Sequence, residues 1–121
     1  MSYESLPILS QDQLNALQEL SVPGQSNLLK ELTALFIQTA IETLENLRQA
    51  IACEDFVSIG MLAHKLKGSG ANLGAVRLHA LCQELEDNVY VQCNDKLNFL
   101  YHKISECLAE TYQALLRESQ S

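Results

Sequence analysis

The sequence predicts an all-α fold, an antiparallel up-down four-helix bundle with a short additional N-terminal helix. Ala, Leu, Gln and Glu dominate the 121 residues, and these residue types favour helices. Five Gly and two Pro leave little turn chemistry for a many-stranded sheet. Apolar residues make up 47% of the chain, which is enough to bury a core. We therefore expect a single helical bundle domain over residues 1–121.

Five helices follow one another along the chain. We expect them at about residues 11–20, 26–53, 55–72, 75–90 and 94–117. Polar residues that can cap a helix N-terminus precede four of them: Ser10 (which resembles a capping box with Gln13), Ser26, Asp55, and Asn94 or Asp95. Terminators follow the first and third helices, Pro23-Gly24 and Leu73-Gly74. The polar tail from Glu118 to Ser121 is expected to fray.

Apolar residues recur at helical spacing in the long helices, so each has a face to bury. The second helix carries Leu29, Leu32, Phe36, Ala40, Leu44, Leu47 and Ile51. The fourth carries Leu78, Leu81, Cys82, Leu85 and Val89, and the fifth carries Leu97, Leu100, Ile104, Cys107, Leu108 and Leu115. Four such helices joined by short loops bury their stripes together as a bundle, with the first short helix closing one end.

Charge and cysteine usage exclude several classes of function. Fifteen acidic residues against eight basic ones give a net charge of −7, which argues against a nucleic-acid partner. No apolar run approaches the roughly 20 residues that span a bilayer, and no secretory signal is visible at the start. The four cysteines form no C-x-x-C pair. We expect buried, reduced thiols in a cytoplasmic, monomeric protein.

The third helix places a histidine on its exposed side. At about 100° per residue, Ile59, Leu62, Leu66 and Leu73 fall within roughly 160° to 220° of His64. These four residues define the buried face. His64 therefore points away from the core, whereas most histidines in apolar helices are satisfied core residues.

Small residues surround His64 on that exposed face. Gly60, Gly68 and Ala71 lie within about 40° of it, so the imidazole stands above a cleared strip. A glycine inside a helix costs about 1 kcal/mol relative to alanine, so these glycines need a reason. Gly70 lies toward the core and is explained by tight packing. Gly60 and Gly68 are explained by a partner that must reach the imidazole.

An exposed imidazole beside a lysine suits transient phosphoryl carriage. A neutral imidazole is a good nucleophile near pH 7, and Lys67 lies one turn away, where a cation can meet phosphoryl oxygens. The chain has no G-x-x-x-x-G-K-[ST] loop and no evident Mg²⁺ site. The metal and the electrophile must therefore come from a partner.

The residues after His64 carry a known signature. The run from His64 to Ala75, then Leu78, Leu81, Cys82, Leu85 and Glu86, resembles the H-x-L-K-G-S and L-G-A pattern of histidine-containing phosphotransfer (HPt) domains. The resemblance implies a four-helix bundle that accepts a phosphoryl group from a receiver's aspartyl-phosphate and passes it to another receiver. It also implies no kinase activity of its own, and Mg²⁺ supplied by the receiver. The partners would be receiver domains of response regulators or hybrid histidine kinases.

The resemblance also assigns roles to individual residues. His64 would be the phosphoacceptor through Nε2, Lys67 would neutralise the phosphoryl group, and Lys65 would add charge from the side. Gly68, with Gly60 and Ala71 beside it, would let the receiver's loops approach. Many relatives have Gln where this chain has Glu86, which would orient the imidazole by accepting a bond from Nδ1–H. The alternative is that Glu86 is only a solvated charge on its helix.

Four other residues invite functional readings. Phe56 and Met61 lie beside His64 and are either boundary residues or the apolar rim that a receiver covers. His79, Cys82 and Glu86 recur along one helix like metal ligands, but Cys82 belongs to the apolar stripe and no second ligand cluster exists. We therefore expect no bound metal.

Three alternatives to a phosphorelay intermediate share some of these sequence features. The phosphoacceptor domain of a chemotaxis-type kinase has the same helix motif, and a helical interaction module would carry no phosphate. An enzyme using His64 as a general base is disfavoured, because an exposed helix face offers no pocket. The sequence leaves open whether the chain is free-standing or a module of a larger kinase.

Overall fold

The computed structural model describes residues 3–20 and 28–119, and every regular element in those ranges is helical. The elements are η1 (Tyr3–Ser5), α1 (Gln11–Glu19), α2 (Leu28–Ala52), α3 (Phe56–Ala71), α4 (Val76–Asn88), η2 (Val89–Val91) and α5 (Asn94–Ser119). The predicted all-α class and the five α-helices are confirmed. No helix in the described ranges is long and apolar enough to cross a membrane.

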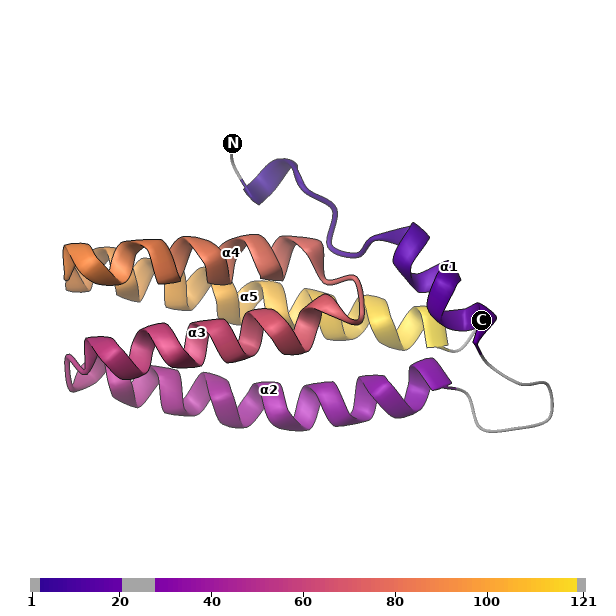
Figure 1. Cartoon of the computed structure of the whole chain (residues 1–121), viewed down its shortest axis with the longest axis horizontal. Coiled ribbons are helices and arrows are strands. Elements are labelled where there is room, and N and C mark those ends of the chain that lie inside the picture. Colours follow the sequence, from indigo (N-terminus) through magenta and orange to yellow (C-terminus); the bar gives the residue numbers. More distant parts are fainter. Residues whose placement is uncertain (1–2, 21–27, 120–121) are drawn as a thin grey trace.

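Four long helices lie side by side with alternating direction (Figure 1). α2 packs against α3 and α5, and α4 packs against the same two helices, so the bundle is a closed square of neighbours. Short connections join α2 to α3 and α3 to α4. The shorter α1 lies at the end of the bundle where α3 turns into α4 (Figure 1), as the sequence predicts.

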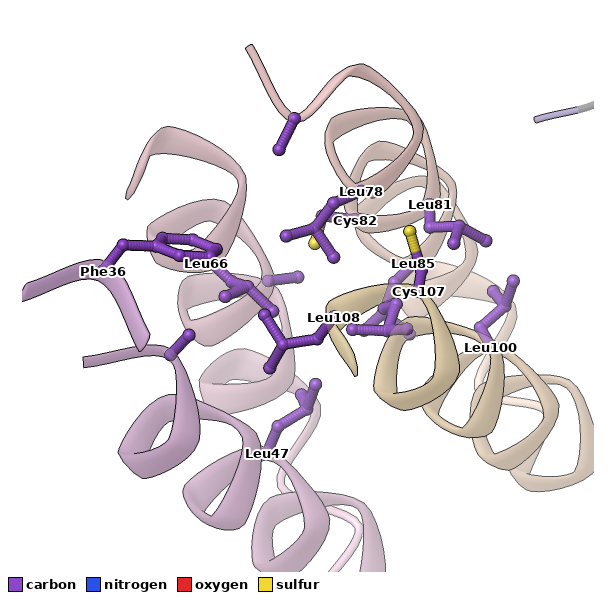
Figure 2. Close-up of a cluster of buried hydrophobic side chains, with 14 of the residues drawn as sticks. Phe36, Leu47, Leu66, Leu78, Leu81, Cys82, Leu85, Leu100, Cys107 and Leu108 are labelled. Carbon is purple, nitrogen blue, oxygen red and sulfur yellow. The ribbon is translucent and has the colours of Figure 1, made fainter. Parts of the chain in front are cut away.

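The core consists mainly of leucine side chains from all four long helices (Figure 2). Every predicted core residue of α4, η2 and α5 is buried. In α2 the predicted stripe is buried except for Leu32 and Leu44, which are half-buried and pack against it. Fully burying a leucine side chain contributes about 1.5–3 kcal/mol, so these stripes hold the bundle together.

Only one of the two hydrogen bonds of the capping box predicted at Ser10 is present. The Ser10 hydroxyl accepts from the Gln13 backbone N–H at 3.4 Å, as predicted. The reciprocal bond is absent, because the Ser10 N–H donates to the Gly74 carbonyl at 2.8 Å. The Gln13 side-chain amide reaches the Ala71 carbonyl at 3.5 Å instead. These contacts hold α1 on the turn between α3 and α4, where Gly74 adopts a φ of +72°.

Asp55 begins α3 as predicted. Its carboxylate accepts from the Ser58 N–H at 3.2 Å and from the Ser58 hydroxyl at 2.7 Å. These two bonds stabilise the ionised form, so they lower the pKa of Asp55. The N-terminus of α3, the helix that carries His64, is therefore capped by a single ionised carboxylate.

Two predictions about helix ends need correction, and two others lie outside the described residues. The Cys93 carbonyl accepts the first bond of α5, from Leu97, so Cys93 takes the capping position predicted for Asn94 or Asp95. The Asn94 amide is instead bonded to the Glu54 carboxylate of the loop between α2 and α3. α5 continues to Ser119, so residues 118–119 of the tail are helical. The predicted stop at Pro23-Gly24, the Ser26 cap and residues 120–121 lie outside the described residues.

The cysteines divide into two pairs, and the expectation that all are buried is wrong. All four are free thiols. Cys82 and Cys107 are buried in the core (Figure 2), and burial raises the pKa of the Cys82 thiol. Cys53 and Cys93 are exposed, because both lie in loops at helix ends.

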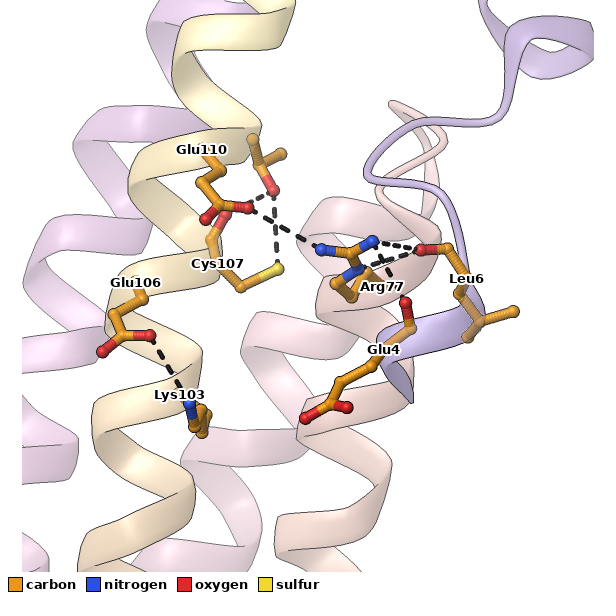
Figure 3. Close-up of polar contacts among 8 residues, drawn as sticks. Glu4, Leu6, Arg77, Lys103, Glu106, Cys107 and Glu110 are labelled. Carbon is orange, nitrogen blue, oxygen red and sulfur yellow. Dashed lines mark hydrogen bonds and ion pairs between the residues drawn. The ribbon is translucent and has the colours of Figure 1, made fainter. Parts of the chain in front are cut away.

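The N-terminal segment is fastened to α4 by Arg77 (Figure 3). The Arg77 guanidinium donates to the Leu6 carbonyl from Nε at 2.9 Å and from Nη2 at 2.6 Å. Its Nη1 lies 3.8 Å from Glu110 of α5. One arginine thus connects the chain start to two helices of the bundle, a contact that the local sequence pattern does not predict.

Candidate functional site

His64 lies on the outer face of α3, as the helical wheel predicts. Its side chain is 72% exposed, whereas Ile59 and Leu66 on the opposite face are fully buried. Leu62 is only half-buried, and Leu73 is buried just beyond the helix end. The core therefore holds α3 in a rotation that presents the imidazole to solvent.

Gly60 and Gly68 leave open space on either side of the imidazole. A Cβ atom built on either residue would meet no heavy atom within 4 Å outside its own helix turn. Gly70 is different, because a Cβ there would lie 3.3 Å from Ala75 Cβ and 3.4 Å from Leu78 Cδ2. Packing within the bundle thus explains Gly70 and leaves Gly60 and Gly68 unexplained.

Two of the small or basic residues expected to lie near His64 are partly covered. Ala71 is half-buried, and its carbonyl accepts a bond from Gln13 of α1. The Lys67 side chain is only 15% exposed. Its position on the wheel gives the direction of its Cβ, but the long side chain turns toward α4 and its acidic groups. Lys65 is exposed on α3.

Lys67 is held by two side chains of α4. Its ammonium lies 2.8 Å from Glu86 Oε1 and donates to Gln83 Oε1 at 2.8 Å. Gln83 in turn donates to Asp87 at 2.9 Å. Sequence reasoning missed Gln83, although its spacing of three residues from Glu86 puts both on one side of α4.

Glu86 links the lysine to the histidine. The same oxygen, Oε1, that contacts Lys67 lies 3.4 Å from His64 Nδ1. The Glu86 side chain is 22% exposed, so the alternative of a solvated surface charge is wrong. Oε1 accepts no hydrogen bond from the described residues, so this is a charge contact that faces Nδ1, and Nε2 lies on the other side of the ring.

A groove of about 650 Å³ runs beside the imidazole. Its lining comes from α3, α4 and η2: Phe56, Val57, Gly60, Met61, His64, Glu86, Val89, Tyr90 and Gln92. The expectation that no pocket lies near His64 is therefore wrong. The reason is that η2 turns back toward α3 after α4 ends, which the sequence pattern of a single helix does not reveal.

The groove has an apolar rim. Met61 is 67% exposed, Phe56 is half-buried, and both line the groove together with His64. Tyr90 of η2, which sequence reasoning did not select, is 90% exposed and also lines the groove. Exposed aromatic and methionine side chains around one reactive group are typical of a protein-binding surface.

The possible metal ligands on α4 do not form a site. Cys82 is buried in the core, His79 is exposed, and Glu86 faces His64 and Lys67. Within residues 3–20 and 28–119, no three His, Cys, Asp or Glu side chains come together as metal ligands. His102 is exposed on α5, where its ring contacts Tyr101.

Comparison with known proteins gives consistent matches. The family model described as Hpt domain matches residues 31–118. A pseudo histidine-containing phosphotransfer protein from Oryza sativa subsp. japonica is 36% identical over 87 residues, 70% of this chain and 55% of the relative. A histidine-containing phosphotransfer protein from Arabidopsis thaliana is 28% identical over 115 residues, 90% of this chain and 69% of the relative. The chain thus spans little more than half the length of the rice protein.

Solved structures agree with this match. Histidine-containing phosphotransfer protein B from Pseudomonas aeruginosa superposes with a TM-score of 0.83 at 27% identity, covering 96% of this chain and 97% of that one. A phosphotransfer protein from Medicago truncatula gives 0.80 at 23% identity, covering 93% of this chain and 80% of that one. The second likeness supports the fold.

Proposed function

The chain belongs to the Hpt domain family, and on that basis we propose that it is a phosphorelay intermediate. It accepts a phosphoryl group on His64 from the aspartyl-phosphate of a receiver domain and passes it to another receiver. The observation that carries the proposal is the exposed imidazole whose Nδ1 faces Glu86 while Gly60 and Gly68 leave the approach open. The rice relative is named a pseudo phosphotransfer protein, so the name of a relative alone does not support transfer.

The accepting step needs a nucleophile and a counter-charge for the ring. The Nε2 lone pair forms a bond to phosphorus, the bond between phosphorus and the receiver's aspartate oxygen breaks, and that electron pair returns to the carboxylate. The ring then carries a positive charge with its proton on Nδ1. The Glu86 carboxylate, 3.4 Å away, stabilises that charge. Passing the group on reverses these steps.

The remaining groups bind the phosphoryl group and the partner. Lys67, and Lys65 from the side, supply positive charge for the phosphoryl oxygens. Gly68, Gly60 and the edge of Ala71 admit the receiver's loops. Phe56 and Met61, together with Tyr90 of η2, form the apolar surface that a receiver covers.

The chain supplies only the carrier. Mg²⁺ stays with the receiver, and the chain has no kinase activity of its own. Its receivers belong to response regulators or hybrid histidine kinases, which it meets in the cytoplasm as a monomer. The free thiols fit a reducing compartment.

Incubation with a receiver charged with labelled phosphate tests the proposal. We expect acid-labile, base-stable label on the chain at one histidine, and no label on a His64→Gln variant. Label that appears only with a kinase domain and ATP would indicate the phosphoacceptor domain of a chemotaxis-type kinase. No label from several receivers, together with binding to them, would indicate an interaction module.

A further inference from the structure

The most unusual feature of the site is that one carboxylate oxygen contacts both the histidine that would carry the phosphoryl group and the lysine that would bind it. Glu86 Oε1 lies 2.8 Å from the Lys67 ammonium and 3.4 Å from His64 Nδ1. The oxygen is shielded from solvent and accepts no hydrogen bond within the described part of the chain, so both contacts are close contacts between charged or chargeable groups. Lys67 is therefore already paired before any phosphoryl group arrives.

A phosphoryl group on Nε2 would compete with Glu86 for Lys67. It brings close to two negative charges and three strong acceptors to the outer side of the ring. The ammonium has three donors, one of which is bonded to Gln83, and its positive charge lies 2.8 Å from Glu86 Oε1. Lys67 must therefore leave Glu86 to serve the phosphoryl group fully, and the freed carboxylate would then repel it.

Glu86 also faces the inner side of the ring. Its Oε1 lies 3.4 Å from Nδ1, so its negative charge favours a ring that keeps a proton there while Nε2 carries phosphorus. When an acceptor oxygen attacks, the P–Nε2 bond breaks and its electron pair returns to Nε2. The leaving group is then neutral imidazole, which needs no proton from elsewhere and leaves readily.

We propose that Glu86 makes the phosphoryl group on His64 short-lived and ready to transfer, by competing for Lys67 and by placing a negative charge beside Nδ1. This inference rests on the proposed function and specifies it further: the chain is a transient carrier that passes the phosphoryl group on and does not store it. A glutamine at this position would keep the shape and the acceptor oxygen without the charge.

The test measures the lifetime of phosphohistidine without any receiver. The chain is phosphorylated with phosphoramidate, a small chemical donor, in a background with His79→Asn and His102→Asn, so that His64 is its remaining histidine. Loss of the group to water then forms a P–O bond, breaks P–Nε2 and releases inorganic phosphate. We expect Glu86→Gln to slow this loss at least about threefold. A factor of this size corresponds to the free energy that a partly exposed ion pair contributes.

Glu84→Gln is the matched control. It removes the same charge from the same helix, where Glu84 pairs with Lys96 of α5 at 3.5 Å. We expect the parent's rate of phosphate loss from this variant. Equal loss from the parent and Glu86→Gln, or equal slowing by both glutamine substitutions, would overturn the proposal.

A double-mutant cycle tests the competition for Lys67. If Glu86 occupies the ammonium, Lys67→Met should accelerate phosphate loss more in the Glu86→Gln background than in the parent. Additive effects would contradict competition. If receivers fail to label the chain while the phosphoramidate measurements give the expected pattern, the relay function falls and the role of Glu86 stands. Failure of phosphoramidate to label His64 would overturn both.

Discussion

Gly68 lies one helical turn beyond His64 on the outer face of α3, and a Cβ atom at Gly68 would meet no neighbouring heavy atom within 4 Å. Helix propensity favours alanine over glycine at such a position. Packing within the bundle therefore does not explain why residue 68 is a glycine. A partner protein that must close over the imidazole of His64 would explain it, because any side chain at this position would lie in its way.

Gly68→Gln separates stability from transfer. We expect the variant to be at least as stable as the parent, because the side chain points into open space and glycine is the poorer helix former. Transfer from a labelled receiver should slow at least about tenfold, since a displacement of about 1 Å can cost 100-fold in rate. Thermal unfolding and the rate of label loss from the receiver are measured on one preparation.

Alanine substitutions provide the control for the expected effect of residue 68 on stability. Gly68→Ala should raise the free energy of unfolding by up to about 1 kcal/mol. Gly70→Ala should gain less, because its Cβ would lie 3.3 Å from Ala75 Cβ. Unchanged transfer by Gly68→Gln would show that the open strip is not needed for partner approach.

His64→Gln should abolish phosphoryl acceptance and leave the fold intact. The side chain is 72% exposed, so its replacement removes little packing. Helical content and melting temperature should match those of the parent, and His102→Gln, at another exposed histidine, is the comparison that keeps full acceptance. A large drop in melting temperature would mean that His64 contributes to the core.

Met61→Asp tests the groove as a receiver surface. Met61 is 67% exposed and lines the groove beside His64, so a charge there should leave stability unchanged and weaken an apolar contact. We expect slower labelling by a receiver and an unchanged rate of labelling by phosphoramidate. Ile41→Asp, at a 59% exposed position on α2, is the control and should affect neither rate. Equal slowing of both reactions by Met61→Asp would point to damage at His64 itself.

The Asp55 cap predicts a loss of stability in acid. Hydrogen bonds from Ser58 place the folded-state pKa of Asp55 below its ordinary value of 3.8. Its contribution is therefore complete above pH 3.8 and is lost as the pH falls through the lower, folded-state pKa. Asp55→Asn keeps a capping oxygen without the titration. Melting temperature measured against pH should fall less steeply below pH 3.8 for this variant, and identical slopes would contradict the role of the cap.

Periodicity predicts the helices and the rotation of α3 well, because both depend on which residues must be buried. Ile59 and Leu66 define the core side of α3, and His64 follows by geometry. The same reasoning fails for Lys67. A wheel places its Cβ on the open strip, but the flexible chain reaches Glu86 and Gln83 on a neighbouring helix.

Contacts between distant segments could not be predicted from the sequence either, because they too depend on neighbouring helices. The Gly74 carbonyl accepts the Ser10 N–H only because α1 folds over the turn between α3 and α4. Tyr90 borders the groove because η2 turns back toward α3. Neither relation leaves a local pattern, since each depends on how whole helices pack. Glu86 is predicted only because the HPt resemblance gives its position the role of orienting the imidazole.

A relay between two receivers tests the central claim most directly. One receiver carries labelled aspartyl-phosphate, the second carries none, and the appearance of label on the second is followed with and without the chain. We predict that label reaches the second receiver quickly only when the chain is present, and that His64→Gln gives the rate seen without it. Equal transfer in all three mixtures would contradict a phosphoryl carrier at His64.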